Sequence, residues 1–294
     1  MPAADTTTLR LATRGSALAL RQAALAADAL RSAGGADPET IVVRTEGDRR
    51  VNAPIDQLDG QGWFTADLER SIVDGRADIA VHSAKDLPSA LAPGLVIAAY
   101  LARADARDGV VTADGRSLDQ LPDGATVGTS SARRAGLLAV LYPGLRAVPI
   151  RGNVDTRLRK LDAGDVDALV LACAGLDRLS LGDRLVERLD PLLFVPAPAQ
   201  GAIALETVAA SRATTVCALI GDAATRVAVT AERAVLLGLG GGCLLPLGAW
   251  ARIHEHQLTL VAALAVDGAI RRAGATGSPD EPEALGEMVA ARLR

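Results

Sequence analysis

The chain has 294 residues, of which 49% are hydrophobic, 22% charged and 2% aromatic, and its formal net charge is −4. This length suits two or three domains with separate cores, whereas the acidic balance and the scarcity of aromatic rings argue against nucleic-acid binding. The three cysteines and three histidines show no ligand spacing, so we expect neither a disulfide framework nor a metal site.

Two segments of the sequence bear on the cellular location of the protein. Residues 1–5 lack the basic and apolar regions of a signal peptide. Residues 234–251 are uncharged, but the glycines at 240–242 and Pro246 interrupt them, which favours a helix end, a glycine turn and a strand over a membrane span. We therefore expect a cytoplasmic protein.

Strand and helix patterns alternate over the first hundred residues. Apolar runs typical of strands fall at residues 9–12, 40–45, 77–82 and 95–101. Ser16 can cap a helix that runs to about residue 32, and residues 63–74 show helical spacing. A polar loop over residues 46–48 is expected after the second strand.

The same alternation repeats over the next part of the chain. Strands are expected at residues 109–112, 125–128, 145–150 and 167–172, with helices beginning near Ser131 and Val154. Such alternation is typical of largely parallel, doubly wound α/β sheets, in which ligands bind beyond the carboxyl ends of the strands.

The C-terminal third has a different pattern. After a stiff connector at residues 195–199, residues 201–205 form a strand that can return to the first sheet. The remaining expected elements are a helix over 223–237, strands at 247–253, 258–266 and 269–275, and a helix from about Glu281. Three adjacent strands with short turns predict a small antiparallel α+β domain.

Four short loops carry arginines, at residues 12–16, 128–134, 151–157 and 175–178. Each follows a predicted strand and enters a predicted helix, where free N–H groups and the helix dipole favour anions. Because a guanidinium binds carboxylates and phosphates in a bidentate way, these loops favour a small ligand with several such groups. Isolated surface salt bridges are the alternative for any one arginine.

Two further residues have both a chemical and a structural interpretation. Asp86 follows an apolar strand and is either a turn-forming residue or a carboxylate that stabilises a ligand-derived cation and relays protons. Cys243 follows three glycines and is either a small buried hydrophobe or a nucleophile that forms a covalent bond. His82, on the strand before Asp86, is expected to be a structural, hydrogen-bonded histidine.

In their order and spacing, the motifs of the chain resemble those of the porphobilinogen deaminase family, also called hydroxymethylbilane synthases. They lie at residues 9–14, 77–88, 128–134, 151–157, 171–176, 199–201, 230–234 and 241–243. Each motif alone is moderately specific, whereas the ordered set spans nearly the whole chain and is very specific.

The resemblance implies that the protein is a transferase. Family members join four porphobilinogen molecules head to tail into the linear tetrapyrrole hydroxymethylbilane, with release of one ammonia per addition. The growing polycarboxylate extends from a dipyrromethane cofactor, attached through a thioether to the cysteine that matches Cys243. We expect a monomer that binds porphobilinogen and the growing oligopyrrole, and neither nucleic acid nor a membrane.

The fold implied by the resemblance is two doubly wound α/β domains, like those of periplasmic binding proteins, that face a cleft. A small C-terminal α+β domain with a three-stranded antiparallel sheet carries the cofactor cysteine. We expect the first domain at residues 1–103 with 201–219, the second at 104–196 and the third at 222–294.

By position, Asp86 matches the catalytic carboxylate of the family and also one of its cofactor-binding positions. The other cofactor-binding matches are Ser83, Lys85, Thr129, Ser131, Arg133, Arg134, Arg157 and Cys243. The matches that bind substrate or the elongating chain are Arg14, Ser16, Gln22, Arg151, Arg157 and Arg178.

The chain departs from the family pattern at three positions. Gln61 stands where a basic residue is usual, which leaves open how its loop covers the cleft. Gly240 and Ala106 also replace the usual residues, but none of the three is assigned to catalysis.

A solute-binding or sensor module is the second hypothesis, because paired α/β domains with anion-binding loops also occur in transport receptors. The glycine-flanked Cys243 and the carboxylate Asp86 favour chemistry over binding alone. Release of ammonia on incubation with porphobilinogen separates the two hypotheses.

Overall fold

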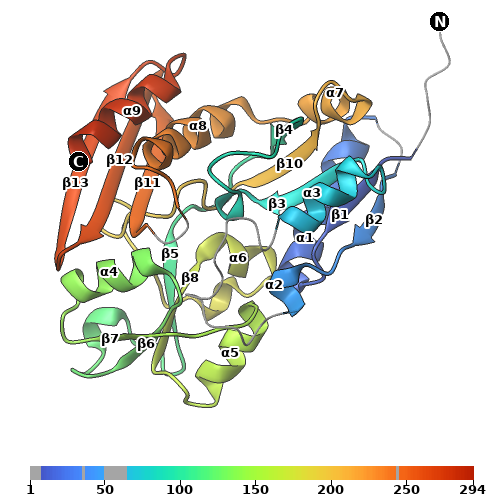
Figure 1. Ribbon diagram of the computed structural model, residues 1–294. Coiled ribbons are helices and arrows are strands. Elements are labelled where there is room, and N and C mark those ends of the chain that lie inside the picture. Colours follow the sequence, from blue (N-terminus) through green and yellow to red (C-terminus); the bar gives the residue numbers. More distant parts are fainter. Residues whose placement is uncertain (1–7, 35–36, 50–64, 243–244) are drawn as a thin grey trace, which may run out of the picture. The chain divides into compact units, whose positions relative to one another are not determined.

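The computed structural model describes residues 8–34, 37–49, 65–242 and 245–294. They divide into two compact units (Figure 1), which are described separately. Unit 1 comprises Met1–Arg103 and Ala202–Arg226, and unit 2 comprises Ala104–Gly201 and Val227–Arg294. Within the described residues, no helix is long and apolar enough to cross a membrane.

Unit 1 is built on a five-stranded sheet in the order β2-β1-β3-β10-β4. Its strands are β1 (Arg10–Thr13), β2 (Glu39–Val42), β3 (Ile79–Ser83), β4 (Leu95–Tyr100) and β10 (Ile203–Val208). β1 pairs in parallel with β2 and β3, whereas β10 is antiparallel to both β3 and β4. The strand predicted to return to the first sheet therefore lies inside it, between β3 and β4.

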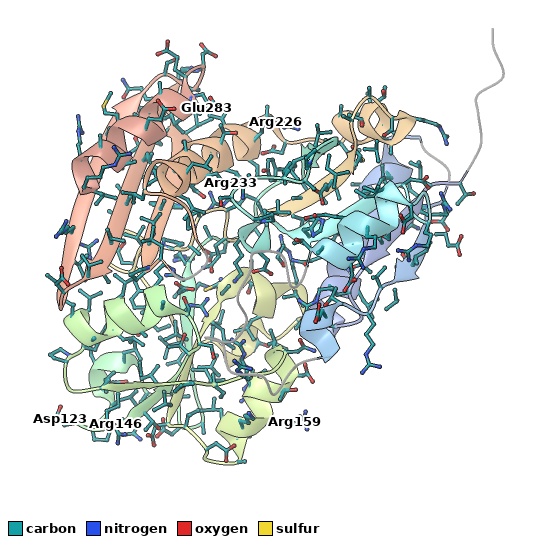
Figure 2. All side chains as sticks on the ribbon, viewed as in Figure 1. Asp123, Arg146, Arg159, Arg226, Arg233 and Glu283 are labelled. Atoms are coloured by element: carbon teal, nitrogen blue, oxygen red, sulfur yellow. The ribbon has the colours of Figure 1, made fainter. Side chains whose placement is uncertain are left out.

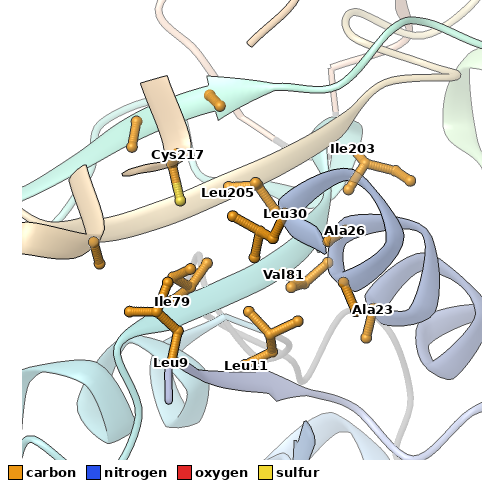
Figure 3. Close-up of a cluster of buried hydrophobic side chains, with 14 residues drawn as sticks. Leu9, Leu11, Ala23, Ala26, Leu30, Ile79, Val81, Ile203, Leu205 and Cys217 are labelled. Carbon is orange, nitrogen blue, oxygen red and sulfur yellow. The ribbon is translucent and has the colours of Figure 1, made fainter. Parts of the chain in front are cut away.

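Helices cover both faces of this sheet. α1 (Ala17–Ser32) and α7 (Arg212–Ala218) pack on one face, where Leu11, Leu30 and Leu205 belong to a continuous apolar cluster (Figure 3). α3 (Ala66–Val73) packs on the opposite face through Leu68 and Ile72. A short helix, α2 (Glu46–Arg49), replaces the predicted loop.

Unit 2 contains a second five-stranded sheet, in the order β7-β6-β8-β5-β9. Its strands are β5 (Asp108–Thr112), β6 (Thr126–Gly128), β7 (Arg146–Val148), β8 (Ala168–Ala172) and β9 (Glu187–Arg188). α4 (Ala132–Leu141) covers one face through Leu137 and Leu138. α5 (Val154–Asp162) and α6 (Cys173–Arg178) cover the other.

The two sheets have equivalent topology. β6 pairs in parallel with β7 and β8, as β1 does with β2 and β3, and β5 is antiparallel to both of its neighbours, as β10 is. The chain order differs, because β5 precedes its sheet-mates whereas β10 follows all of its own. Each sheet is mixed, with one antiparallel strand, so the expectation of largely parallel strands holds for the other four.

The C-terminal part of unit 2 consists of two layers, one of strands and one of helices. β11 (Leu247–His254), β12 (Gln257–Val266) and β13 (Ala269–Gly277) make a three-stranded antiparallel sheet. α8 (Ala223–Gly238) and α9 (Pro282–Leu293) pack on one face of it (Figure 1), around Val235, Leu260 and Val289. The α/β class and the antiparallel C-terminal sheet are confirmed.

Candidate functional site

The turn after β3 presents two charged residues to solvent. A single 3₁₀ turn, η2 (Ala84–Asp86), follows the strand, and Ala84 and Leu87 on either side are buried. The Ala84 N–H donates to the Ala202 carbonyl at 3.0 Å, which fixes the start of the turn against β10. Because its neighbours are anchored inside, the exposed Lys85 and Asp86 project outward. Among the described residues, the Asp86 carboxylate has no ion pair or hydrogen bond.

The loop after β1 supplies a second group of predicted residues in unit 1. Ser16 caps α1, since its hydroxyl accepts from the Ala19 N–H at 3.2 Å. Gln22, six residues after Ser16, is buried, and its Nε2 donates to the Ser83 hydroxyl at 2.9 Å. The structure thus joins Gln22 to the end of β3, three residues before Asp86. Arg14 lies half-buried in the same loop.

The matching loop of unit 2 follows β6 and enters α4. Ser131 caps this helix, and its hydroxyl accepts from the Arg134 N–H at 3.4 Å. Thr129 is buried, and its hydroxyl accepts from the Ser131 N–H at 3.2 Å. The predicted helix N-terminus with its capping serine is therefore present.

Arg133 and Arg134 turn into the core of unit 2 instead of out from the loop. Only 4% and 5% of their surfaces are exposed, in contrast to Arg146 and Arg159, which lie on the surface (Figure 2). Arg133 Nη1 and Arg134 Nη2 each lie 2.6 Å from a different oxygen of the Asp108 carboxylate, which is fully buried. The pair is therefore built into the fold, and its binding role remains a prediction.

This buried cluster is extensively hydrogen-bonded. Arg134 Nη1 donates to the Val170 carbonyl and Arg133 Nη1 to the Val195 carbonyl, while Gln200 Nε2 donates to Asp108 at 2.9 Å. Burial alone would raise the pKa of Asp108, but the charges of Arg133 and Arg134 outweigh it and hold that pKa well below its usual range. Asp108 is therefore an anion at neutral pH.

The remaining arginines lie in two other parts of unit 2. Arg157, in the first turns of α5, donates from Nε to the Gly152 carbonyl at 2.8 Å, and Arg151 lies half-buried before this helix. Arg178 is the last residue of α6. The prediction that its loop enters a helix is therefore wrong, because residues 175–178 are themselves helical and Arg178 lies at the carboxyl end of the dipole.

Arg178 is instead hydrogen-bonded to the last residue of the first segment of unit 2. Its Nη2 donates to the Gly201 carbonyl at 2.7 Å, and burial lowers the pKa of Arg178 to about 10, so it stays charged at neutral pH. Gly201 has a φ of +91°, and a Cβ there would lie 2.6 Å from the Ala104 carbonyl oxygen. This position therefore requires glycine.

Two predicted positions cannot be placed. Cys243 and Gln61 lie outside the described residues. The other two cysteines are described: both are buried, and burial raises the pKa of the Cys173 and Cys217 thiols to about 12. Neither is a thiolate at neutral pH, so neither is a suitable nucleophile.

Sequence reasoning missed the buried carboxylates that organise each unit. Asp108 was not singled out, although it begins an apolar strand, and Glu206 in β10 is also fully buried. A signal for the inward direction of Arg133 and Arg134 existed, because they stand four residues before the buried Leu137 and Leu138. Residues spaced by four share a helix face.

Comparison with known proteins decides the family. Residues 9–216 match the family described as porphobilinogen deaminase, dipyromethane cofactor binding domain, and residues 226–294 match porphobilinogen deaminase, C-terminal domain. The chain belongs to the porphobilinogen deaminase family. The expected resemblance is confirmed, and the activity indicated is that of a transferase of tetrapyrrole biosynthesis with a dipyrromethane cofactor.

Curated porphobilinogen deaminases match over nearly the full chain. The enzyme of Mycolicibacterium gilvum (strain PYR-GCK) is 46% identical over 97% of this chain and 95% of its own. The enzyme of Mycobacterium tuberculosis (strain ATCC 25618 / H37Rv) is 48% identical with the same coverage. Among solved structures, the VFT2 domain of Bordetella pertussis BvgS is 20% identical, with a TM-score of 0.41 over 72% of this chain and 86% of that domain.

Proposed function

We propose that Asp86 is the catalytic carboxylate of a porphobilinogen deaminase, and that Cys243 carries its dipyrromethane cofactor. The observation that carries the proposal is the turn after β3, where an exposed carboxylate follows buried strand residues and is anchored by Ala84 and Leu87. Gln22 and Ser83, which match binding positions of the family, are hydrogen-bonded at the base of this turn.

The reaction needs an anion at the point where positive charge develops. Porphobilinogen loses ammonia when the bond between its methylene carbon and its protonated amine breaks, which leaves a pyrrole-stabilised cation. A carbon–carbon bond must then form between this methylene and the free α-carbon of the pyrrole that is extended, and the proton on that α-carbon must be removed. Asp86 can stabilise the cation and accept that proton, a contribution of roughly 3–4 kcal/mol if it equals one preorganised donor.

The cofactor provides the primer from which the pyrrole chain is extended. Its acid side chains require cationic donors, and the buried Nε–H of Arg133 has no acceptor within the described part of the chain. The capped loops that begin α1 and α4 add N–H groups of helix termini, which favour carboxylates. These residues fit the group, and we assign Ser83, Lys85, Thr129, Ser131, Arg133, Arg134 and Arg157 to it.

The assignment of Cys243 is supported by the burial and the raised thiol pKa values of the other two cysteines. Thioether formation needs an accessible thiolate, and the raised pKa values of the buried Cys173 and Cys217 disfavour both. Cys243 is the third cysteine of the chain and stands beside three glycines.

The substrate and its product are polycarboxylates, and we assign their acid side chains to Arg14, Ser16, Gln22, Arg151, Arg157 and Arg178. We further propose that the protein acts as a cytoplasmic monomer with three domains, at residues 1–103 with 201–219, 104–196 and 222–294. The topological equivalence of the two five-stranded sheets supports the first two of these domains.

Whole-protein mass spectrometry tests the cofactor assignment. We expect the purified chain to exceed its sequence mass by a two-pyrrole adduct, which Cys243→Ser abolishes and Cys217→Ala, a matched control, retains. An unmodified wild-type chain, or an adduct that survives Cys243→Ser, would overturn this assignment.

The catalytic assignment is tested separately. We expect Asp86→Asn to keep the adduct and the fold but to release ammonia from porphobilinogen roughly 10²–10³-fold more slowly. Asp74→Asn, which changes an exposed carboxylate of the same unit, should leave the rate unchanged. Near-normal turnover of Asp86→Asn would remove Asp86 from this role, and wild-type binding of porphobilinogen without ammonia release would favour a solute-binding module.

A further inference from the structure

Below the Asp86 turn, unit 1 holds an imidazole and two carboxyl groups that the proposed chemistry does not use. His82 and Glu206 are buried, and Glu69 is half-buried. His82 and Glu206 lie on the same face of the sheet, because β3 and β10 pair His82 with Ala204 and Ala80 with Glu206. His82 Nε2 lies 3.0 Å from Glu206 Oε2, and the two side chains are 2% and 0% exposed. This hydrogen bond joins the two strands in the interior.

The third member comes from the helix that covers this face. α3 packs on β3 and β10, and Glu69 projects from it toward the pair, where its main charged neighbours are Glu206 and His82. Glu69 Oε1 and Glu206 Oε1 are buried, and neither has a hydrogen-bond partner within the described residues. One imidazole therefore lies beside two carboxyl groups in this part of unit 1.

The position of this cluster connects it to the Asp86 turn. β10 pairs with β3 up to Ser83, which faces Ile203, and the next contact is the hydrogen bond from the Ala84 N–H to the Ala202 carbonyl. His82 stands two residues before Ala84 and four before Asp86. Whatever fixes His82 to β10 therefore also fixes the strand end from which Asp86 projects.

We propose that His82 and Glu206, with Glu69 packed against them, are positioning residues that hold the Asp86 turn in its reactive place. The inference rests on the proposed role of Asp86. It assigns to the buried hydrogen bond between His82 and Glu206 the role of fixing the strand end before Asp86, and to Glu69 the role of packing over this pair.

The electrostatics of Glu69 agree with this arrangement. Its burial, together with the nearby Glu206 carboxylate, raises the pKa of Glu69 above the usual range. No cation among the described residues pairs with it, and partial removal from water without a counter-charge disfavours the ionised form of a carboxyl group. Glu69 therefore keeps its proton to a higher pH than an exposed glutamate does.

Two substitutions at His82 test whether its hydrogen bond to Glu206, and not only the volume of its side chain, is needed for activity. His82→Gln can still donate to Glu206 from an amide, whereas His82→Leu cannot. We expect His82→Leu to lower kcat for ammonia release by about ten- to a hundred-fold, with KM changed far less, since small displacements of a reactive group have effects of this size. His82→Gln should recover most of kcat, and the exposed His254→Leu is the matched control.

Hydrogen exchange provides a readout that does not depend on activity. In His82→Leu, the amides of residues 83–87 should exchange faster than in the wild type, while the matched segment after β8, residues 172–176, should not change. Unchanged exchange and unchanged kcat in a folded His82→Leu protein would overturn the proposal. If His82→Leu does not fold, we compare His82→Gln with His82→Asn instead, because the shorter amide of asparagine cannot reach Glu206. Equal kcat values for these two variants would overturn the proposal.

The state of Glu69 is tested by unfolding as a function of pH. Because the folded state binds the Glu69 proton more tightly than the unfolded chain, this group lowers stability as the pH rises from the unfolded pKa through the folded pKa. Glu69→Gln should therefore be more stable than the wild type above that window and equal to it at lower pH. The exposed Glu287→Gln should show no such difference, and a Glu69→Gln protein that is less stable at pH 8 would contradict the proposal.

These outcomes are distinguishable from failure of the proposed function. If Asp86→Asn retains turnover, the catalytic assignment fails whatever His82→Leu shows. If Asp86→Asn is inactive while His82→Leu has normal kcat and normal exchange, only the positioning proposal fails.

Discussion

The sheets of units 1 and 2 share one strand order but give their buried carboxyl groups different partners. Each carries a fully buried acid on its antiparallel fourth strand, Glu206 on β10 and Asp108 on β5. Glu206 contacts an imidazole on the neighbouring strand, whereas Asp108 binds two arginines from a helix. The same topology therefore supports two interiors of different electrostatic character.

The equivalent helices explain the difference. Counted from the capping serines, Arg133 and Arg134 of α4 correspond to Leu18 and Ala19 of α1. The equivalent turns differ as well, because β3 leads to the exposed Lys85 and Asp86 whereas β8 leads into the buried start of α6. Unit 1 thus has an exposed carboxylate at the place where unit 2 has the buried start of a helix.

The largest effect is expected from breaking the arginine cluster. Asp108→Asn leaves two buried guanidinium groups without their counter-charge, and removal of one partner of a buried pair costs about 3–5 kcal/mol of the free energy of unfolding. Urea unfolding, followed by the fluorescence of Trp250 in a Trp63→Phe background, measures this in unit 2. A loss no larger than that of the exposed Glu287→Gln would show that the cluster contributes little.

Acid should weaken the same cluster without mutation. The folded-state pKa of Asp108 is depressed, so its contribution is present above the unfolded pKa, near 4, and is lost as the pH falls below it toward the folded pKa. We expect the unfolding free energy of the wild type to fall more steeply below about pH 4 than that of Asp108→Asn. Parallel curves for the two proteins would contradict this account.

A smaller effect is expected in unit 1. Glu206→Gln retains the shape of the side chain and an oxygen that can accept from His82, so we expect a loss of about 1–3 kcal/mol. The measurement is the same urea titration, followed by circular dichroism. A loss equal to that of Asp108→Asn would mean that both units depend on a buried charge to the same degree.

Loss of a helix-capping serine should lower the free energy of unfolding by a similar amount in the two units. Ser16→Ala and Ser131→Ala each remove one bond to a helix N–H, and each should cost about 1 kcal/mol. Asn153, at the start of α5, makes no such side-chain bond, so Asn153→Ala should cost clearly less. Thermal unfolding of the three variants makes the comparison, and equal losses would show that the caps do not contribute through these bonds.

Periodicity and capping predicted most of the helices and strands, but not the order and direction of the strands within each sheet. Apolar runs located β1, β3 and β8, and Ser16 and Ser131 marked two helix starts. The direction of a strand has no such signal, because alternating residues look alike in parallel and antiparallel pairs. The antiparallel setting of β5 and β10 and the short β9 therefore became visible only in the structure.

The candidate site was predictable in type but not in detail. The order of motifs predicted the family, and Asp86 lies in an exposed turn, where its catalytic role stays a prediction. The directions of Arg133 and Arg134 depend on a partner, Asp108, that is 25 and 26 residues away in the chain. Arg178 was misplaced because the apolar run before it conceals the boundary between β8 and α6.

The late position of β10 in the chain has a consequence for biosynthesis. The ribosome releases β1 to β4 long before it reaches residue 203, and until then the sheet of unit 1 lacks the strand between β3 and β4. During that interval His82 lacks its hydrogen-bond partner Glu206 and two strand edges stay unpaired, a state that favours aggregation. Unit 1 thus begins first and is completed only after most of the polypeptide has emerged, so truncated nascent chains should depend on chaperones until Glu206 has been added.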